Sequence, residues 1–143
     1  MDNLVKSLEV VLADCYALYL KTQNYHWNVE GTRFKELHET FEKHYKDLAE
    51  AVDTVAELIR ALNSKTIGTF SDFMKLTNIK DGNAKLSAEK MLDDLINDHI
   101  IMEKTLAKAL KEAQKVGDEV VISFVADRLT VHRKNIWMMK SSR

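Results

Sequence analysis

The sequence predicts an all-α fold, a bundle of four long helices, and three observations support this class. Proline is absent and glycine occurs only four times in 143 residues, so little in the chain interrupts a helix. Apolar residues recur at alternating steps of three and four, which is the spacing of one helix face. The turn residues that closely spaced strands need are too few for a sandwich or a barrel.

Length and composition indicate one domain spanning residues 1–143. A chain of this size can bury about 70% of the surface that its unfolded form exposes. Lys and Arg (21) nearly balance Asp and Glu (22), which argues against a surface built for nucleic acid or anionic lipid. No apolar run is long enough for a membrane span, and one cysteine cannot form an intrachain disulfide. We therefore expect a cytoplasmic protein without a membrane segment.

The first two helices are expected on either side of Gly31. The first runs from about Val5 to residue 28, and its stripe contains Leu8, Leu12, Cys15, Tyr19, Thr22 and His26. The second is expected to begin after an N-cap at Thr32 and to span about 30 residues. Its stripe contains Phe34, Leu37, Phe41, His44, Leu48, Ala51, Val55, Leu58 and Leu62.

The segment 63–86 predicts a long crossover with a short helix near residues 71–77. The third helix follows an N-cap at Ser87 and ends before Gly117, and the fourth follows an N-cap at Asp118. Short links make the first and second helices antiparallel neighbours, and likewise the third and fourth. The inner faces are expected to contain Leu92, Leu95, His99, Met102, Leu106, Ala109 and Ala113, and then Ile122, Val125, Leu129, His132, Ile136 and Met139.

One sector of the second helix carries four possible metal ligands, His38, Glu42, Asp53 and Glu57, which lie within about 100° of arc. Glu42 and Asp53 are separated by about 16 Å along the axis, too far for one ion. A two-fold axis between residues 42 and 53 would bring His38 of one copy beside Asp53 and Glu57 of another. His26 could join His38 across the short turn.

Each of these residues also has an ordinary structural interpretation, as part of a solvated face or as a packing side chain. Asp53 and Glu57, however, repel each other at this spacing unless a cation or partner offsets them. The mixed imidazole and carboxylate set suits Fe(II) or Zn(II). A di-iron site within one bundle needs two Glu-x-x-His motifs, and the chain has none. His99 and His132 are expected to be packing residues, and His44 is ambiguous.

The run Lys21-Thr-Gln-Asn-Tyr-His-Trp-Asn-Val-Glu-Gly31, with the later Leu37-His38 and Asp53-Thr-Val-Ala-Glu57, resembles the Dps mini-ferritins, DNA-binding proteins from starved cells. Residues 127–139 resemble the last helix of that family. The resemblance implies a ferritin-like bundle and a dodecameric shell. It further implies ferroxidase sites at two-fold interfaces, which oxidise iron from Fe(II), preferably with hydrogen peroxide. Storage of Fe(III) inside the shell would protect against oxidative stress.

By this resemblance, His26, His38 and Glu42 are metal ligands from one subunit, and Asp53 and Glu57 are ligands from its mate. Trp27 matches a tryptophan of the family that lies beside the site and is thought to take part in electron transfer. The choice between peroxide and oxygen as oxidant stays open.

DNA binding is expected to be weak or absent, because no Lys/Arg-rich tail flanks the predicted helices. Two alternatives to the ferroxidase remain. One is a non-enzymatic nucleoid protein that coats DNA. The other is a structural helical oligomer whose carboxylates bind zinc or nothing.

Overall fold

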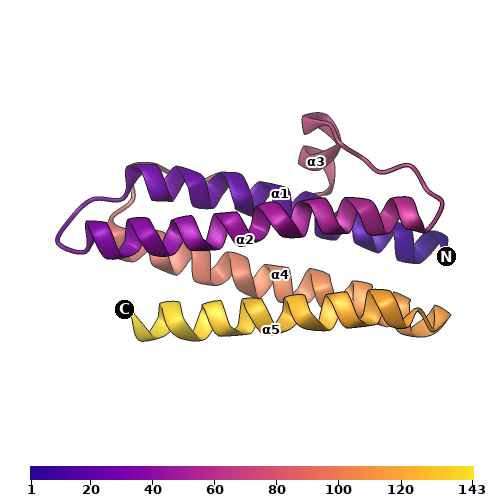
Figure 1. Ribbon diagram of the computed structural model, residues 1–143. Coiled ribbons are helices and arrows are strands. Elements are labelled where there is room, and N and C mark those ends of the chain that lie inside the picture. Colours follow the sequence, from indigo (N-terminus) through magenta and orange to yellow (C-terminus); the bar gives the residue numbers. More distant parts are fainter.

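The computed structural model describes residues 1–143 and contains five helices and no strand. Four long helices run side by side: α1 (Asp2–Asn28), α2 (Phe34–Ala61), α4 (Ala88–Val116) and α5 (Glu119–Ser141). The short helix α3 (Phe70–Leu76) projects from the long connection between α2 and α4 (Figure 1). The predicted all-α bundle with a helix in its crossover is confirmed.

Three predicted helix ends, those at Ser87, Gly117 and Asp118, are confirmed by capping contacts or cap conformation. The Ser87 hydroxyl accepts a hydrogen bond from the Lys90 backbone N–H at 3.2 Å, and the Asp118 carboxylate accepts one from Val121 N–H at 3.1 Å. Gly117 ends α4 with φ at 69°, a left-handed conformation that glycine adopts without strain. These local contacts place the α4–α5 turn where the sequence predicts it.

Three helix starts differ from the prediction. The first helix begins at Asp2 rather than Val5. Thr32 does not cap α2; Arg33 occupies that position without a side-chain cap, and its guanidinium binds Glu36 and the Ser142 carbonyl instead. The helix α3 begins at residue 70 rather than 71, because the Thr69 hydroxyl accepts a hydrogen bond from Asp72 N–H.

The core runs the length of the bundle between α1, α2, α4 and α5. The predicted stripe of α4 is buried at every position. On α2, Ile59 is buried in place of the predicted Leu58, and Phe34 is 43% exposed. The predicted stripe repeats every 3.5 residues, whereas an α-helix has 3.6 per turn, so the buried face drifts along a long helix.

Polar residues fasten the crossover to the bundle. The buried Asp14 carboxylate on α1 accepts hydrogen bonds from the Thr77 hydroxyl (2.7 Å), the Asn78 N–H (2.7 Å) and the Thr105 hydroxyl (2.6 Å). These contacts join α1, α4 and the segment after α3. A buried carboxylate needs such donors, since an unpaired one would be costly.

A second buried polar group lies nearer the C-terminal end of α1. The Lys21 ammonium contacts Asp98 at 2.8 Å and Asp94 at 3.1 Å. Burial raises the pKa of the Asp98 carboxyl to about 6, although its contact with Lys21 opposes that shift.

None of the five helices is long and apolar enough to cross a lipid bilayer.

Candidate metal centre

The turn between α1 and α2 brings His26 and His38 together in a reciprocal arrangement. His26 Nδ1–H donates to the His38 carbonyl oxygen at 2.7 Å, and His38 Nδ1–H donates to the His26 carbonyl oxygen at 2.7 Å. The rings stack with centroids 3.8 Å apart and planes 15° from parallel. Since a carbonyl oxygen can only accept, each Nδ1 carries the proton, and each Nε2 keeps a lone pair for a metal.

Glu42 follows His38 by about one helical turn and completes a cluster of three potential ligands. Its Oε1 lies 3.8 Å from His26 Nε2, and one ligand atom from each of the three residues lies within 4.8 Å of the others. The hydrogen bond and charge of Lys46, 2.8 Å from Oε2, hold the pKa of the Glu42 carboxyl below its ordinary value. The cluster therefore combines an ionised carboxylate with two imidazole rings whose Nδ1 atoms are bound to backbone carbonyls.

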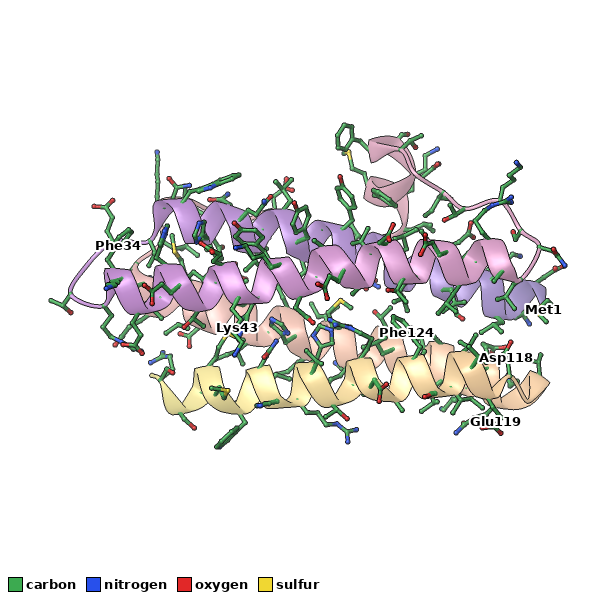
Figure 2. The ribbon with its side chains drawn as sticks, viewed as in Figure 1. Met1, Phe34, Lys43, Asp118, Glu119 and Phe124 are labelled. Atoms are coloured by element: carbon green, nitrogen blue, oxygen red, sulfur yellow. The ribbon has the colours of Figure 1, made fainter.

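Aromatic neighbours fix the two imidazole rings. The Phe34 ring stacks on His38 with centroids 5.0 Å apart, and the Tyr45 ring meets His26 edge-on at 5.2 Å. Phe34 marks this end of the bundle in Figure 2, where α2 begins. His26 is only 6% exposed, but the Glu42 side chain is 39% exposed, so the cluster opens to solvent on one side.

Asp53 and Glu57 do not join this cluster within the chain. Both are exposed on α2, further along the helix, and neither makes an ion pair. The only group of three or more side chains within reach of one ion consists of His26, His38 and Glu42. The chain thus brings together three of the five predicted ligands and leaves the two carboxylates apart, as the spacing along α2 requires.

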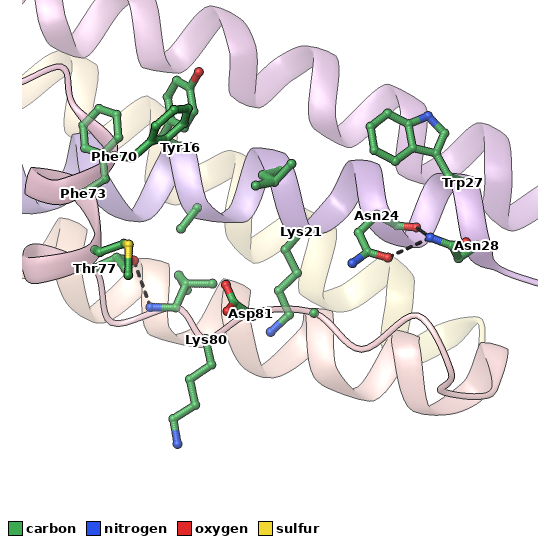
Figure 3. Close-up of a pocket in the computed structure, with 15 residues that line it drawn as sticks. Tyr16, Lys21, Asn24, Trp27, Asn28, Phe70, Phe73, Thr77, Lys80 and Asp81 are labelled. Atoms are coloured by element: carbon green, nitrogen blue, oxygen red, sulfur yellow. Dashed lines mark hydrogen bonds between the residues drawn. The ribbon is translucent and has the colours of Figure 1, made fainter.

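Trp27 directly follows His26 on α1 and is largely exposed. Its side chain is 60% exposed and lines a surface groove of about 720 Å³ between α1, α3 and the segment after α3. Figure 3 shows Tyr16, Phe70 and Phe73 at one end of this groove and Trp27 at the other. The predicted role of Trp27 in electron transfer stays a prediction.

A second group of histidines lies in the bundle core; His99 and His132 were predicted as packing residues, and His44 was ambiguous. His99 on α4 and His132 on α5 are fully buried, and their Nδ1 atoms lie 2.8 Å apart. Arg128 donates to His132 Nε2 at 2.9 Å and to the Asp47 carboxylate at 2.8 Å. His44 contacts this pair from α2, its ring centroid 5.9 Å from that of His99.

The hydrogen bonds determine which core nitrogens carry protons. A guanidinium only donates, so His132 Nε2 is the acceptor and His132 Nδ1 carries the proton. That proton is donated to His99 Nδ1, which leaves the remaining proton of His99 on Nε2. Neither residue offers a free lone pair, so this pair is not a metal site. Burial lowers the pKa of His99 to about 3 and that of His132 well below its ordinary value.

The cysteine has the environment expected of a packing residue. Cys15 is 1% exposed, and burial raises the pKa of its thiol to about 12. A thiol that stays protonated and is shielded from solvent is unreactive. The sequence-based interpretation of Cys15 as a position on the buried stripe is confirmed.

Comparison with known proteins identifies similar chains over almost the whole length. A family model for the ferritin-like domain matches residues 5–142. General stress protein 20U of Bacillus subtilis is 31% identical, with 98% of this chain and 97% of that protein covered. The DNA protection during starvation protein of Helicobacter pylori is 31% identical, with 94% of each covered.

Solved structures show the same fold. Dps from Staphylococcus aureus superposes with a TM-score of 0.96 at 32% identity, covering 99% of this chain and 95% of that one. The Dps protein from Vibrio cholerae O1, described as a member of a broad superfamily of ferritin-like diiron-carboxylate proteins, gives a TM-score of 0.94 at 29% identity. That match covers 98% of this chain and 88% of the other.

Proposed function

We propose that this chain, which belongs to the Dps family of ferritin-like proteins, oxidises Fe(II) at sites shared between two copies and stores the Fe(III) product in a hollow oligomer. The observation that carries the proposal is the cluster of His26, His38 and Glu42. Two imidazole lone pairs and an ionised carboxylate converge on a position that is open to solvent. The chain holds iron ligands there, but not enough to surround two ions.

The missing ligands are proposed to come from a second copy. Asp53 and Glu57 are exposed, unpaired and one turn apart on the same helix as His38. Two α2 helices that lie antiparallel about a two-fold axis would place these carboxylates against the cluster of the neighbouring chain. Each pair of chains would then gain two equivalent sites, each with two imidazoles and three carboxylates.

The ligand types fit the proposed reaction. Imidazole suits borderline Fe(II), and carboxylates favour the harder Fe(III) product. Two Fe(II) ions together supply two electrons to one hydrogen peroxide molecule, which takes up two protons and becomes two water molecules. Because both electrons arrive together, no hydroxyl radical is released. Hydrogen peroxide is the proposed oxidant, with oxygen as the slower substitute.

The assembly is proposed to be a homo-oligomer, with twelve copies expected from the family. Large apolar side chains are exposed around the groove beside α3, among them Leu20, Trp27, Phe70 and Met74. Exposed apolar surface of this kind marks an interaction site.

We place the reaction in the cytoplasm, where it would protect against iron and peroxide. The near-neutral charge supports weak or absent DNA binding.

The proposal is tested by replacing both Asp53 and Glu57 with Ala. We expect the initial rate of Fe(II) oxidation to fall at least about 100-fold, because two ligands of every site are lost. Formation of Fe(III) is followed by its ultraviolet absorbance after addition of peroxide, and size-exclusion chromatography checks the assembly. The matched control replaces Glu89 and Asp93, an exposed carboxylate pair with the same spacing on α4. Unchanged oxidation by the Asp53/Glu57 variant would remove the site assignment.

A further inference from the structure

We propose that Lys46 is a specificity-determining residue of the metal centre, whose ammonium group competes with an incoming metal ion for the Glu42 carboxylate and promotes release of Fe(III). The inference rests on the proposed ferroxidase function and adds a residue that is not a metal ligand. An ammonium group has three donors and no lone pair, so it acts on the metal only through its positive charge. Its contact with Glu42 carries the argument.

Lys46 and the candidate metal position share the Glu42 carboxylate. Lys46 Nζ–H donates a hydrogen bond to Glu42 Oε2 at 2.8 Å, while Glu42 Oε1 lies 3.8 Å from His26 Nε2. A metal ion that bound both oxygens of Glu42 would have to displace the ammonium group. A metal ion on Oε1 alone would remain close to that positive charge. In either case the lysine opposes metal binding.

The position of Lys46 on α2 places it among the ligands. At 100° per residue it lies about 80° around the helix axis from His38, inside the arc of about 100° that ends at Glu57. It follows Glu42 by one turn, which is about 6 Å along the axis. If Asp53 of a second copy faces Glu42, as the proposed function requires, the ammonium group also lies within about one turn of that carboxylate. Lys46 thus acts as a tethered counter-ion of the metal-free centre.

The ammonium group is held loosely enough to leave. The Lys46 side chain is 65% exposed and forms its only ion pair with Glu42. An exposed pair four residues apart on a helix contributes little to stability, so separating the two groups costs little. Their hydrogen bond is also the largest cause of the lowered pKa of the Glu42 carboxyl. The pair therefore opens when a metal ion arrives and closes when the ion leaves.

The repulsion between Lys46 and a bound ion depends on the charge of that ion. Coulomb energy is proportional to charge, so at the same distance the repulsion of Fe(III) is half as large again as that of Fe(II). Carboxylates have the opposite preference, because they favour the harder Fe(III). A centre with three carboxylates and no nearby cation would retain its product. Lys46 offsets one of those negative charges, so Fe(III) leaves and the centre is free for further Fe(II).

The first test measures the affinity of the whole assembly for Co(II) alone, followed by visible absorption without any oxidant. Lys46→Met removes the charge and keeps an unbranched side chain. We expect the Kd for Co(II) to fall roughly fivefold at low salt. The difference should shrink below about twofold in about 0.5 M NaCl, because salt screens the lysine charge. Lys46→Arg keeps a cation at this position and should bind Co(II) as the wild type does.

The matched control is Lys43→Met. Lys43 is an exposed lysine on the same helix and makes no ion pair. Its substitution changes the net charge equally but leaves the contact between Lys46 and Glu42 intact. The Kd for Co(II) should therefore stay within about twofold of the wild-type value. Circular dichroism and size-exclusion chromatography check that every variant folds and assembles.

The second test follows the departure of the product. After each centre has oxidised two Fe(II) ions with hydrogen peroxide, the return of its capacity to bind saturating Co(II) reports that Fe(III) has left. We expect this return to be at least about threefold slower in Lys46→Met than in the wild type or in Lys43→Met, because the trivalent ion loses the stronger repulsion.

The outcomes separate the inference from the proposed function. Equal Co(II) affinity in Lys46→Met and Lys43→Met, or an equally fast return of Co(II) binding, would overturn the inference even where Fe(III) formation is normal. No Fe(III) formation by the wild type would instead overturn the proposed function. Tighter Co(II) binding by Lys46→Met would in that case still support the competition for Glu42.

Discussion

The two histidine pairs of this chain both bring their rings into contact, but they have opposite chemical capacities. His26 and His38 donate their Nδ1 protons to backbone carbonyls, so both Nε2 lone pairs stay free beside a solvent-exposed carboxylate. His99 and His132 bind each other, and Arg128 occupies the second nitrogen of His132. Hydrogen-bond partners therefore decide which histidines can hold a metal, and the number of histidines in a bundle does not.

The surroundings reinforce this difference. Near His26, the carboxylate of Glu42 provides negative charge that a cation would neutralise. Near His132, the charged neighbour is the guanidinium of Arg128, which would repel a cation, and the Asp47 carboxylate is already paired with it. The first pair is suited to bind Fe(II), and the second is suited to fix α4 and α5 against α2.

The largest expected difference between the two pairs is in iron oxidation. We expect His38→Ala to lower the initial rate at least about 100-fold, since a ligand is removed from every site. His99→Leu should keep the rate within a few fold, because His99 offers no lone pair to the metal. Co(II) binding, followed by its visible absorption, provides a second readout that needs no oxidant. Equal losses in both variants would show that the distinction between the pairs is wrong.

The next expected effect is on the free energy of unfolding, and it concerns the core pair rather than the metal-site pair. We expect His132→Leu to cost about 2–3 kcal/mol, because it leaves a donor of the buried Arg128 guanidinium unpaired. Arg133→Ala, at the neighbouring exposed position, should change stability by less than about 0.5 kcal/mol. Urea unfolding at one fixed protein concentration measures both, since assembly contributes to stability. A loss for His132→Leu no larger than that for Arg133→Ala would contradict the proposed role of the core pair.

The helix boundaries and the core were largely predictable from the sequence. Gly117 and the caps at Ser87 and Asp118 act through contacts within a few residues, so the pattern alone locates them. Arg33 was not predictable as the start of α2, because its guanidinium reaches Ser142 from the other end of the chain. Ile59 was missed because a 3.5-residue repeat was extended over a helix with 3.6 residues per turn.

The grouping of His26, His38 and Glu42 was predictable from the sequence, but its detail was not. The spacing along α2 predicted that Glu42 and Asp53 cannot share an ion within one chain, and the short turn predicted that His26 meets His38. The backbone bonds that set the protonation of both rings depend on the turn geometry. The pairing of His99 with His132 depends on how α4 and α5 are rotated about their axes. The apolar pattern of a helix predicts that rotation only to within one residue.

A further expected effect is a loss of stability in mild acid. The folded-state pKa of His99, about 3, lies below the ordinary value of 6.5, and burial is the largest cause. Burial also lowers the pKa of His132, and Arg128 and His44 face this residue. Below pH 6.5 the unfolded chain therefore binds more protons than the folded one, so stability present at neutral pH falls as the pH falls. The slope is about 1.4 kcal/mol per pH unit for each histidine.

One carboxyl opposes that trend and must be separated from it. The raised pKa of Asp98, about 6, means that the folded chain binds the extra proton between that value and the ordinary 3.8. Asp98 thus adds stability as the pH falls through that range, and this gain offsets the loss of stability that about one histidine causes. Comparison of urea midpoints at pH 7 and pH 5, in the wild type and in His99→Leu, isolates the histidine contribution. An identical pH dependence in both proteins would contradict it.

The central claim, that each iron site is shared by two chains, is tested most directly by mixing two inactive variants. One carries His26→Ala and His38→Ala, and the other carries Asp53→Ala and Glu57→Ala. In a mixed pair of chains one site keeps all its wild-type ligands and the other keeps only Glu42. We expect oxidation of Fe(II) to recover after the subunits exchange, up to about a quarter of the wild-type rate when pairing is random. Exchange demonstrated by mass spectrometry without any recovery would contradict shared sites.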